Sequence, residues 1–450
     1  MLNLSVLALT WFFRSYVLIL RKLNRIAIML NKFMAGLSLL ALVFLTFVGG
    51  IAVSYLKLPI YRFFTSTWDS VKVMLAEPDR LMPAVHDFAG VRIHDKNALA
   101  EGLTLITSYF PEFDWEAGAR LINVDGEVLH RWHIDPNEVF GTRNNLPYIH
   151  GSYLFLNGDL LLSYEFVGLA RVSACGDVKW KITDPVSHHS VTIADDGTFW
   201  VSANRMLSQD DSRNVPLFKA LSYPIYEDIF MQVSADGEIL REISAIDVLD
   251  KNGLGEVYLR IGRKFQGDIF HLNDVEQLSS ALAEQYPMFD AGDIAVSLRD
   301  LNMLLVVDPD TLLVKWYTYT QTTFQHDIDF IGDGWVGVFD NRYDRTEDGK
   351  ILGGSRVLAI RPDTNEEKTL FPTEKSPNFY TKWSGKWQKL DGGNLLLTEA
   401  RAGRALEVTA DGTPVWEWVI ERFNANEVPE VMEATRYVYT TDDVATWKCP

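Results

Sequence analysis

The feature that most constrains this chain is a two-part repeat that runs from about residue 115 to near the C-terminus. One part is a strand, a tight turn and a second strand, with an Asp-Gly-like pair at the turn and usually a Trp after it. It occurs six times: ARLINVDGEVLHRW, ARVSACGDVKWKI, FMQVSADGEILREI, LLVVDPDTLLVKW, VLAIRPDTNEEKTL and ALEVTADGTPVWEW. Asp-Gly supplies the positive φ values of a two-residue hairpin turn, and the alternating apolar flanks predict strands on both sides.

The other part of the repeat places a polar residue, usually histidine, eight positions before a turn glycine and a hydrophobic strand. The pairs are His150 and Gly158, His189 and Gly197, His326 and Gly334, and, with glycine in the histidine position, Gly385 and Gly393. After His271 a longer segment, VEQLSSALAEQYPMF, intervenes before Gly292. Four strands per unit and about six units predict an all-β fold, a six-bladed β-propeller. We expect the late segment ATRYVYTT to close the ring by pairing into the first blade.

Composition narrows the class of protein further. The chain has 450 residues, of which 47% are hydrophobic and 23% charged, as in ordinary globular proteins. Its net charge of -18 lacks the basic footprint that binding to nucleic acid requires, so we expect no nucleic-acid partner. Two cysteines, Cys175 and Cys449, exclude a disulfide-rich scaffold and a four-thiolate zinc site, and the sequence does not show whether they pair.

The N-terminus differs from the rest of the chain. Residues 1–32 carry five basic residues and no acid, and residues 33–56 carry no charge at all. This predicts a basic cytoplasmic N-terminus (1–32), a single transmembrane anchor (33–56), a linker (57–110) and the propeller (111–450). The basic flank places the propeller on the periplasmic side of the inner membrane. A cleaved signal peptide is the competing interpretation, but the apolar run exceeds the usual signal length.

The repeat register places histidines at equivalent positions of different blades. His150, His189, His271 and His326 should therefore lie on one ring around the propeller axis. The residue seven positions after each turn glycine marks the end of the next strand, and these residues are Glu165, Asn204, Arg299 and Asn341. Together they predict a polar pocket. Zinc is one ligand for clustered imidazoles, but Arg299 opposes a dication unless carboxylates compensate, so we expect an anionic ligand and no metal.

The segments QHDIDFIGDGWVGVFDNR, HLND with the later SLRD, and HHSVTIADDGTFWV resemble those of the bacterial arylsulfotransferases. These are extracytoplasmic six-bladed propeller enzymes that do not use the nucleotide sulfate donor. The resemblance covers roughly residues 110–425, and its most specific piece is Gln325-His326 followed by Phe339-Asp340-Asn341. It implies that His326 becomes transiently sulfated, and that His271, Asn273, Arg299 and His189 hold the sulfuryl oxygens.

Two departures from that family stand out. Its enteric members are usually soluble periplasmic proteins with a short-range disulfide near the site, and this sequence has no such cysteine pair. The blade with His271 also carries the inserted segment, which could reshape the funnel that the loops at one end of the propeller form.

The resemblance and the residues together predict sulfuryl transfer from an aryl sulfate to a phenolic acceptor by a ping-pong mechanism through a sulfohistidine at His326. His271 and Arg299 would act with it in catalysis, and His189, Asn273, His150 and Asn341 would bind substrate. We expect no cofactor, since no phosphate-binding loop is present. A homo-oligomer is compatible with the sequence.

Two alternatives stay open at this point. One is a membrane-anchored, non-catalytic binding or scaffold propeller, which has no use for a ring of histidines beside Arg299. The other is a quinone-cofactor dehydrogenase, which typically needs eight blades and a set of metal-binding carboxylates.

Overall fold

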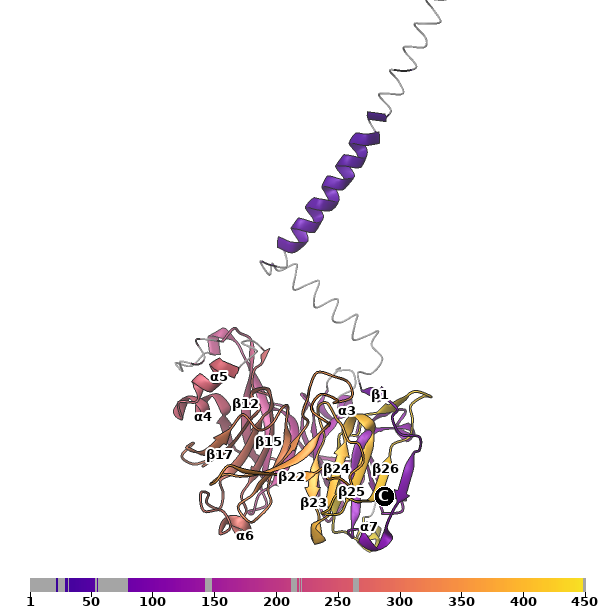
Figure 1. The fold of residues 1–450 in the computed structure, drawn as a ribbon, viewed down its shortest axis with the longest axis vertical. Coiled ribbons are helices and arrows are strands. Elements are labelled where there is room, and N and C mark those ends of the chain that lie inside the picture. Colours follow the sequence, from indigo (N-terminus) through magenta and orange to yellow (C-terminus); the bar gives the residue numbers. More distant parts are fainter. Residues whose placement is uncertain are drawn as a thin grey trace, which may run out of the picture. The chain divides into compact units, whose positions relative to one another are not determined.

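The structure, a computed structural model, describes residues 22, 29–30, 32–52, 55, 80–141, 148–211, 217, 219, 221–261 and 267–447. The chain divides into two compact units, Met1–Glu77 and Pro78–Pro450 (Figure 1). Most of the predicted cytoplasmic segment, residues 57–79 of the predicted linker, and Cys449 lie outside the described residues.

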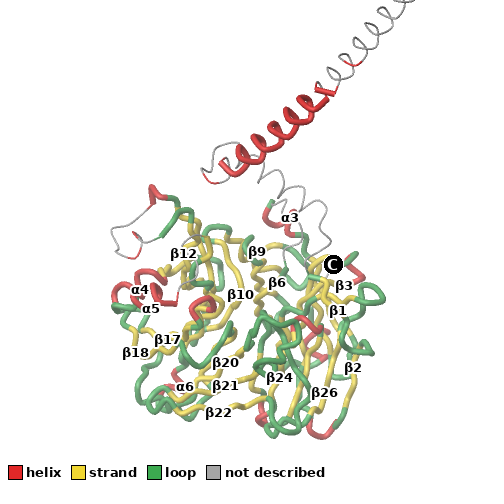
Figure 2. The backbone as a smooth tube through the Cα atoms, turned by 45° about the horizontal axis from the view of Figure 1, so that its top comes forward, coloured by secondary structure: helices red, strands yellow, loops and turns green. Residues whose placement is uncertain are grey.

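The second unit consists mainly of six antiparallel sheets, each forming one blade of a propeller (Figure 2). Blade 1 has the order β28 (Glu433–Tyr437), β3 (Leu103–Phe110), β4 (Glu116–Ile122) and β5 (Val128–His133). Blade 2 contains β6 (Ile149–Leu154), β7 (Leu160–Tyr164), β8 (Gly168–Val172) and β9 (Val178–Ile182). Blade 3 contains β10 (Val186–Ile193), β11 (Phe199–Leu207), β12 (Ile225–Val233) and β13 (Ile239–Ser244), with β14 (Gly267–Asp268) beside β12.

The other three blades follow the same order along the chain. Blade 4 contains β15 (Leu272–Gln277), β16 (Ile294–Leu298), β17 (Met303–Val307) and β18 (Val314–Thr318). Blade 5 contains β19 (His326–Phe330), β20 (Val336–Asp340), β21 (Arg356–Arg361) and β22 (Glu366–Phe371). Blade 6 contains β23 (Trp387–Lys389), β24 (Leu395–Glu399), β25 (Arg404–Val408) and β26 (Pro414–Val419). The predicted six-bladed propeller is confirmed.

The ring is closed by strands from the two ends of the unit. β28 pairs with β3 in the register Glu433↔Thr107, so the expected closure by the late segment is confirmed. On the other side, β2 (Gly90–Ile93) adds a fifth strand to the edge of blade 6. β1 (Leu81–Pro83) pairs with β27 (Glu427–Pro429) in a separate two-stranded sheet. Strands β1 to β3, which the sequence placed in the linker 57–110, are thus part of the propeller unit.

The predicted hairpins join the third and fourth strands of each blade, but the turn type differs from the prediction. In the turn after β12, Gly237 N donates to Ser234 O and Ser234 N donates to Glu238 O. Only Gly237 in this turn has a positive φ, at 85°. The turn is therefore a three-residue loop with a glycine bulge, because a two-residue type I′ turn needs positive φ at both central residues.

Tryptophans on the outer strands pack blades against one another. Trp180 of β9 donates through Nε1 to Ala235 O, in the hairpin turn of blade 3. A Cβ on Gly237 would lie 2.5 Å from the Trp180 ring, so this turn needs glycine for contact as well as for its φ. Trp416 of β26 donates to Val124 O in the corresponding turn of blade 1. These two Trp side chains thus join blade 2 to blade 3 and the last blade to the first, whereas Nε1 of Trp132 and of Trp316, in blades 1 and 4, has no hydrogen-bond partner.

Among the described residues of the second unit, five short α-helices lie outside the blades. They are α3 (Pro136–Phe140), α4 (Ala245–Lys251), α5 (Gly255–Ile261), α6 (Ser280–Ala283) and α7 (Thr441–Ala445).

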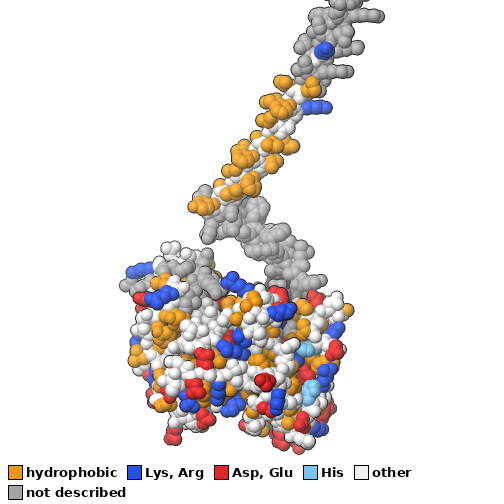
Figure 3. All heavy atoms as spheres, viewed as in Figure 1, with side chains coloured by type: hydrophobic (Ala, Val, Ile, Leu, Met, Phe, Trp, Pro, Cys, Tyr) orange, Lys and Arg blue, Asp and Glu red, His pale blue; other side chains and the backbone are white. Residues whose placement is uncertain are grey.

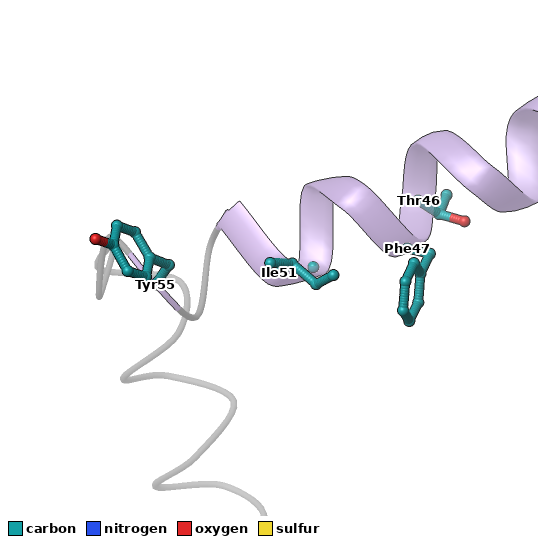
Figure 4. A pocket seen from close by; sticks show the side chains of 5 residues that line it. Thr46, Phe47, Ile51 and Tyr55 are labelled. Carbon is teal, nitrogen blue, oxygen red and sulfur yellow. The ribbon is translucent and has the colours of Figure 1, made fainter.

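Among the described residues of the first unit, one helix, Lys32–Ala52, is long and apolar enough to cross a membrane. Figure 3 shows hydrophobic side chains along it. Thr46, Phe47 and Ile51 line a shallow hollow on the surface of this helix together with Gly50 and Tyr55 (Figure 4). These residues bear no ionisable groups suited to chemistry other than the Tyr55 phenol. The helix fits a single-pass anchor or a signal sequence.

Candidate functional site

Irregularities at the start of four inner strands position the polar side chains. The pairing registers shift around His150 on β6, around His188 and His189 on β10, at Asn273 on β15 and at Asp327 on β19. His189 and His271 have positive φ values of 58° and 55°, which are unusual for residues other than glycine. Because these inner strands contact one another around the axis, their histidines converge.

The structure brings the four predicted histidines together around His189. The centroid of the His189 ring lies 3.9 Å from that of His150, 4.8 Å from that of His271 and 5.7 Å from that of His326. His189 Nε2 and His271 Nε2 are 3.0 Å apart and share a hydrogen bond. Burial, with the neighbouring imidazoles, holds the pKa of His189 well below its ordinary value, so this ring is neutral at pH 7.

Asn341 fixes the tautomer of His326. The two side chains meet at 2.7 Å between His326 Nδ1 and Asn341 Oδ1. Asn341 Nδ2 donates to Thr381 O and Ser384 O, so the amide is oriented with its oxygen towards the imidazole. His326 must therefore carry its proton on Nδ1, and Phe324 O accepts from the same nitrogen at 3.1 Å. The lone pair on His326 Nε2 is left available for attack on an electrophile.

Arg299 supplies the positive charge of the cluster. It follows β16, and its backbone N–H donates to His271 O, so the two predicted catalytic residues are backbone neighbours. Its guanidinium donates to Asp300 Oδ1 at 2.9 and 3.0 Å and lies 5.2 Å from the Phe324 ring centroid. Burial and then the charge of Arg299 hold the pKa of His326 well below its ordinary value. His326 is consequently a neutral imidazole at pH 7, as a nucleophile must be.

Asp268 orients His271 from the side opposite His189. His271 Nδ1 forms a hydrogen bond with Asp268 Oδ2. Burial alone would raise the pKa of Asp268, but the charge of His271 and this hydrogen bond lower it below the usual range. The carboxylate is therefore ionised and accepts the proton of His271 Nδ1, which leaves His271 Nε2 facing His189 Nε2.

Asn273 and Gln325 hold the segment before His326 in place. Asn273 Nδ2 donates to Gln325 O at 2.7 Å, while its buried Oδ1 has no hydrogen-bond partner. Gln325 Nε2 donates to Ser297 Oγ at 3.1 Å, which ties the start of blade 5 to blade 4. The predicted substrate ligand Asn273 is thus also a support for the backbone that carries His326.

His150 and His189 face the same carboxylate. Glu165, which directly follows β7, has its Oε1 atom 3.7 Å from His150 Nδ1 and 3.7 Å from His189 Nδ1. These distances exceed hydrogen-bond length, and neither Nδ1 atom has a hydrogen-bond partner. Glu430 is buried nearby and also has an unpartnered oxygen, Oε1.

Sequence reasoning missed most of the acids that surround the histidines. Asp268, Asp300 and Glu430 do not occupy the positions that the His-x7-Gly register marks: Asp268 lies on β14, Asp300 in the 3-10 turn after β16, and Glu430 directly after β27. His188 was passed over in favour of its neighbour, and its ring centroid lies 5.2 Å from that of His189. Burial lowers the pKa of His188 to about 3.

The inserted segment of blade 4 lies away from the site. It connects Gln277 to Ile294, which pair at the opposite end of the β15–β16 ladder from Leu272 and Leu298, the residues beside His271 and Arg299. Its Tyr286 instead donates to Trp335 O of blade 5. The insertion therefore supports the neighbouring blade and does not shape the funnel around the histidines.

A second set of ionisable residues, the channel carboxylates, occupies β15 and β19 further along the inner strands. They are Asp274, Glu276, Asp327 and Asp329. Lys386 lies 3.6 Å from Asp327 and 3.3 Å from Glu433 of β28. Burial raises the pKa of Glu276 and of Asp327 to about 7 in each case.

Cys175, in the turn between β8 and β9, is disulfide-bonded. The sequence contains one other cysteine, Cys449.

The fold and the cluster define a six-bladed β-propeller that gathers imidazoles and an arginine at one end of its inner strands. The family model "Arylsulfotransferase (ASST)" matches residues 153–422, which is more than half of the chain. The chain therefore belongs to the arylsulfotransferase family and is a sulfotransferase enzyme. His189, His271 and His326 lie within the matched residues, and His150 lies just before them.

Comparison with solved structures gives distant similarities. A protein of unknown function from Bacteroides caccae is 12% identical, with a TM-score of 0.46, over 74% of this chain and 98% of that one. A catalytically inactive virginiamycin B lyase from Staphylococcus aureus is 13% identical, with a TM-score of 0.40, over 78% and 88%. TolB from Acinetobacter baumannii is 11% identical, with a TM-score of 0.40, over 74% and 66%. No curated protein sequence matches the chain significantly.

Proposed function

We propose that this protein transfers a sulfuryl group from an aryl sulfate to a phenolic acceptor through a sulfohistidine at His326. The observation that carries the proposal is the hydrogen bond of 2.7 Å between His326 and Asn341, which leaves Nε2 of a neutral imidazole free. The charge of Arg299 acts on His326, and the ring centroid of His189 lies 5.7 Å from that of His326. The family of the chain supports the substrate class.

In the first half-reaction, the lone pair of His326 Nε2 attacks sulfur. The N–S bond forms as the S–O bond to the aryl group breaks, and the electron pair of that bond leaves on the phenolate oxygen, which then takes up a proton from water. Arg299 and the imidazole N–H groups would stabilise the charge on the three non-bridging oxygens. Splitting the transfer into two steps is the advantage that a covalent intermediate gives.

In the second half-reaction, the acceptor phenol loses its proton and its oxygen attacks sulfur. The N–S bond breaks, and His326 regains its lone pair. His271 is the base we assign to this proton transfer, because its Nδ1–H is held by ionised Asp268 and its other nitrogen faces the cluster. The cycle requires no nucleotide.

We also propose that the helix Lys32–Ala52 anchors the enzyme in the inner membrane with the propeller on the periplasmic side. The helix has the length and hydropathy of a span. The basic residues before it favour a cytoplasmic N-terminus. Protease added to cells with a permeabilised outer envelope should then degrade the propeller, and full protection would show the orientation to be wrong.

The covalent intermediate gives the direct test of the mechanism. The full chain in detergent is mixed briefly with an aryl sulfate alone, quenched at alkaline pH and digested for mass spectrometry. We expect one added sulfuryl group on the peptide that contains His326, and neither adduct nor donor cleavage in His326→Ala. The control is His133→Ala. His133 lies on the outer strand β5 and pairs with Glu116 of β4. A His326→Ala variant that turns over donor at the rate of the control would refute the mechanism.

A further inference from the structure

Two buried imidazole nitrogens without a hydrogen-bond partner converge on one carboxylate oxygen beside the proposed sulfuryl site. His150 Nδ1 and His189 Nδ1 each lie 3.7 Å from Glu165 Oε1. The side chains of His150 and Glu165 are each 7% exposed and that of His189 is 4% exposed. Both nitrogens lack a hydrogen-bond partner, although burial normally forces polar atoms to find one. The three ligand atoms all lie within 4.8 Å of one another.

The hydrogen bonds around His271 are compatible with a metal ion at His189 Nδ1. His271 Nδ1 is bonded to Asp268 Oδ2, and His271 Nε2 lies 3.0 Å from His189 Nε2. With its proton on Nε2, His189 donates across this contact to His271 Nε2. His189 Nδ1 then keeps its lone pair, which faces the carboxylate oxygen of Glu165. Two lone pairs that face each other in a buried place repel one another, and a cation between them removes this repulsion.

We propose that His150 Nδ1, His189 Nδ1 and Glu165 Oε1 form a three-ligand site for a divalent transition metal ion of the Zn²⁺ type. An ion about 2.1 Å from both atoms of a 3.7 Å pair would see them at an angle of about 124°, within reach of a tetrahedral or trigonal arrangement after small adjustments. Two imidazoles and one carboxylate suit Zn²⁺, whereas Mg²⁺ and Ca²⁺ prefer oxygen ligands throughout.

This proposal goes beyond sulfuryl transfer, and it revises the expectation from sequence that the cluster holds no metal. That expectation rested on the charge of Arg299, which would oppose a dication unless carboxylates compensated. The structure supplies those carboxylates: Asp300 accepts two hydrogen bonds from Arg299, and Glu165 lies between the two imidazoles. Glu430 adds a further buried carboxyl group near His150, with Arg80 and Arg401 as its cationic neighbours.

The test measures metal binding without relying on activity. The full chain is purified in detergent with a tag that contains no histidine, stripped of metal, and then dialysed separately against Zn²⁺ and Co²⁺. We expect about one metal ion per chain by inductively coupled plasma mass spectrometry, as for a single three-ligand site. Co²⁺ should give visible absorption bands of nitrogen and oxygen coordination.

Two variants and a control assign the ion to this site. Glu165→Gln keeps the size of the side chain but removes its charge, and His150→Ala removes one nitrogen ligand. Both should lose the bound ion and the Co²⁺ bands, while His133→Ala, which breaks a surface histidine–glutamate pair, should keep them. Thermal unfolding of each variant shows that it is folded, and Glu165→Gln suffices if His150→Ala does not fold. Absence of metal from the wild-type chain, or equal binding by folded Glu165→Gln, would overturn the proposal.

Discussion

Replacing Asn341 with alanine tests whether this residue positions His326 rather than binding substrate. The change removes the acceptor for His326 Nδ1–H and the donor to Ser384 O. Thr381 O keeps a second donor, Ser355 Oγ, at 3.1 Å. The Nδ1–H group keeps Phe324 O at 3.1 Å, so the required tautomer is weakened but not lost.

The size of the effect follows from the charge that His326 gains during attack on sulfur. A hydrogen bond from a neutral imidazole contributes about 1 kcal/mol, and one from a charged imidazole about 1.5–3 kcal/mol. Asn341 therefore stabilises the transition state by about 1.5 kcal/mol more than the ground state, which corresponds to roughly tenfold in rate. We expect Asn341→Ala to lower kcat for donor cleavage by about that factor and to leave KM nearly unchanged.

The assay is phenol release from a chromogenic aryl sulfate, followed over a range of donor concentrations with the full chain in detergent. Asn394→Ala is the matched control. This substitution also removes an amide that donates to two oxygens, Ala98 O and Glu407 Oε1, but the Asn394 side chain forms no hydrogen bond with a histidine. Its kcat should stay at the wild-type value. The reasoning fails if Asn341→Ala raises KM while kcat is kept, or if it abolishes cleavage as completely as His326→Ala.

Three further predictions address charge and stability. Arg299→Ala should slow donor cleavage by about 10²–10³ but leave a measurable rate, because one charge-stabilising donor is lost and the nucleophile remains; complete inactivity in a folded variant would contradict this division of roles. Because burial raises the pKa of Glu276 to about 7 from 4.5, the folded state binds that proton more tightly than the unfolded chain, and stability should fall as the pH rises from 4.5 past 7. Glu276→Gln should flatten this fall in urea unfolding, and an unchanged slope would be evidence against it. Arg436→Ala should lower the free energy of unfolding by about 3–5 kcal/mol, since it leaves Glu407 buried without the partner at 3.1 Å; a loss within about 1 kcal/mol would show that the pair is not a stabilising contact.

The fold could be predicted from sequence because it repeats. Each blade follows the same pattern of strand, turn and strand, so a wrong strand prediction in one blade is corrected by comparison with the other five. The equivalent positions of His150, His189 and His326 follow from the same register. The extra strand β2 could not be predicted in this way, since Gly90–Ile93 is outside the repeat and finds its partner only when blade 6 exists.

The polar partners of the histidines could not be predicted from the repeat, because segments outside the repeat position them. Asn341 falls in the register, but its role depends on which way its amide points, and Thr381 and Ser384 of a later loop decide that. Asp268 reaches His271 from the short strand β14, which pairs in parallel with β12 of another blade. The orientation of these side chains depends on the tertiary pairing of the segments that carry them, and the sequence pattern carries no signal for it.

Closure of the ring by β28 determines when this molecule can finish folding. Arg436 Nε of β28 donates to Thr104 Oγ1, a residue 332 positions earlier in the chain. Relative to closing a hairpin of about ten residues, bringing such distant segments together costs about 3 kcal/mol more in chain entropy. Blade 1 must also wait for its innermost strand until the end of the chain has been synthesised. During synthesis the first blade therefore exposes an unpaired strand edge for longer than any other, and this edge is the part of the nascent propeller most exposed to aggregation.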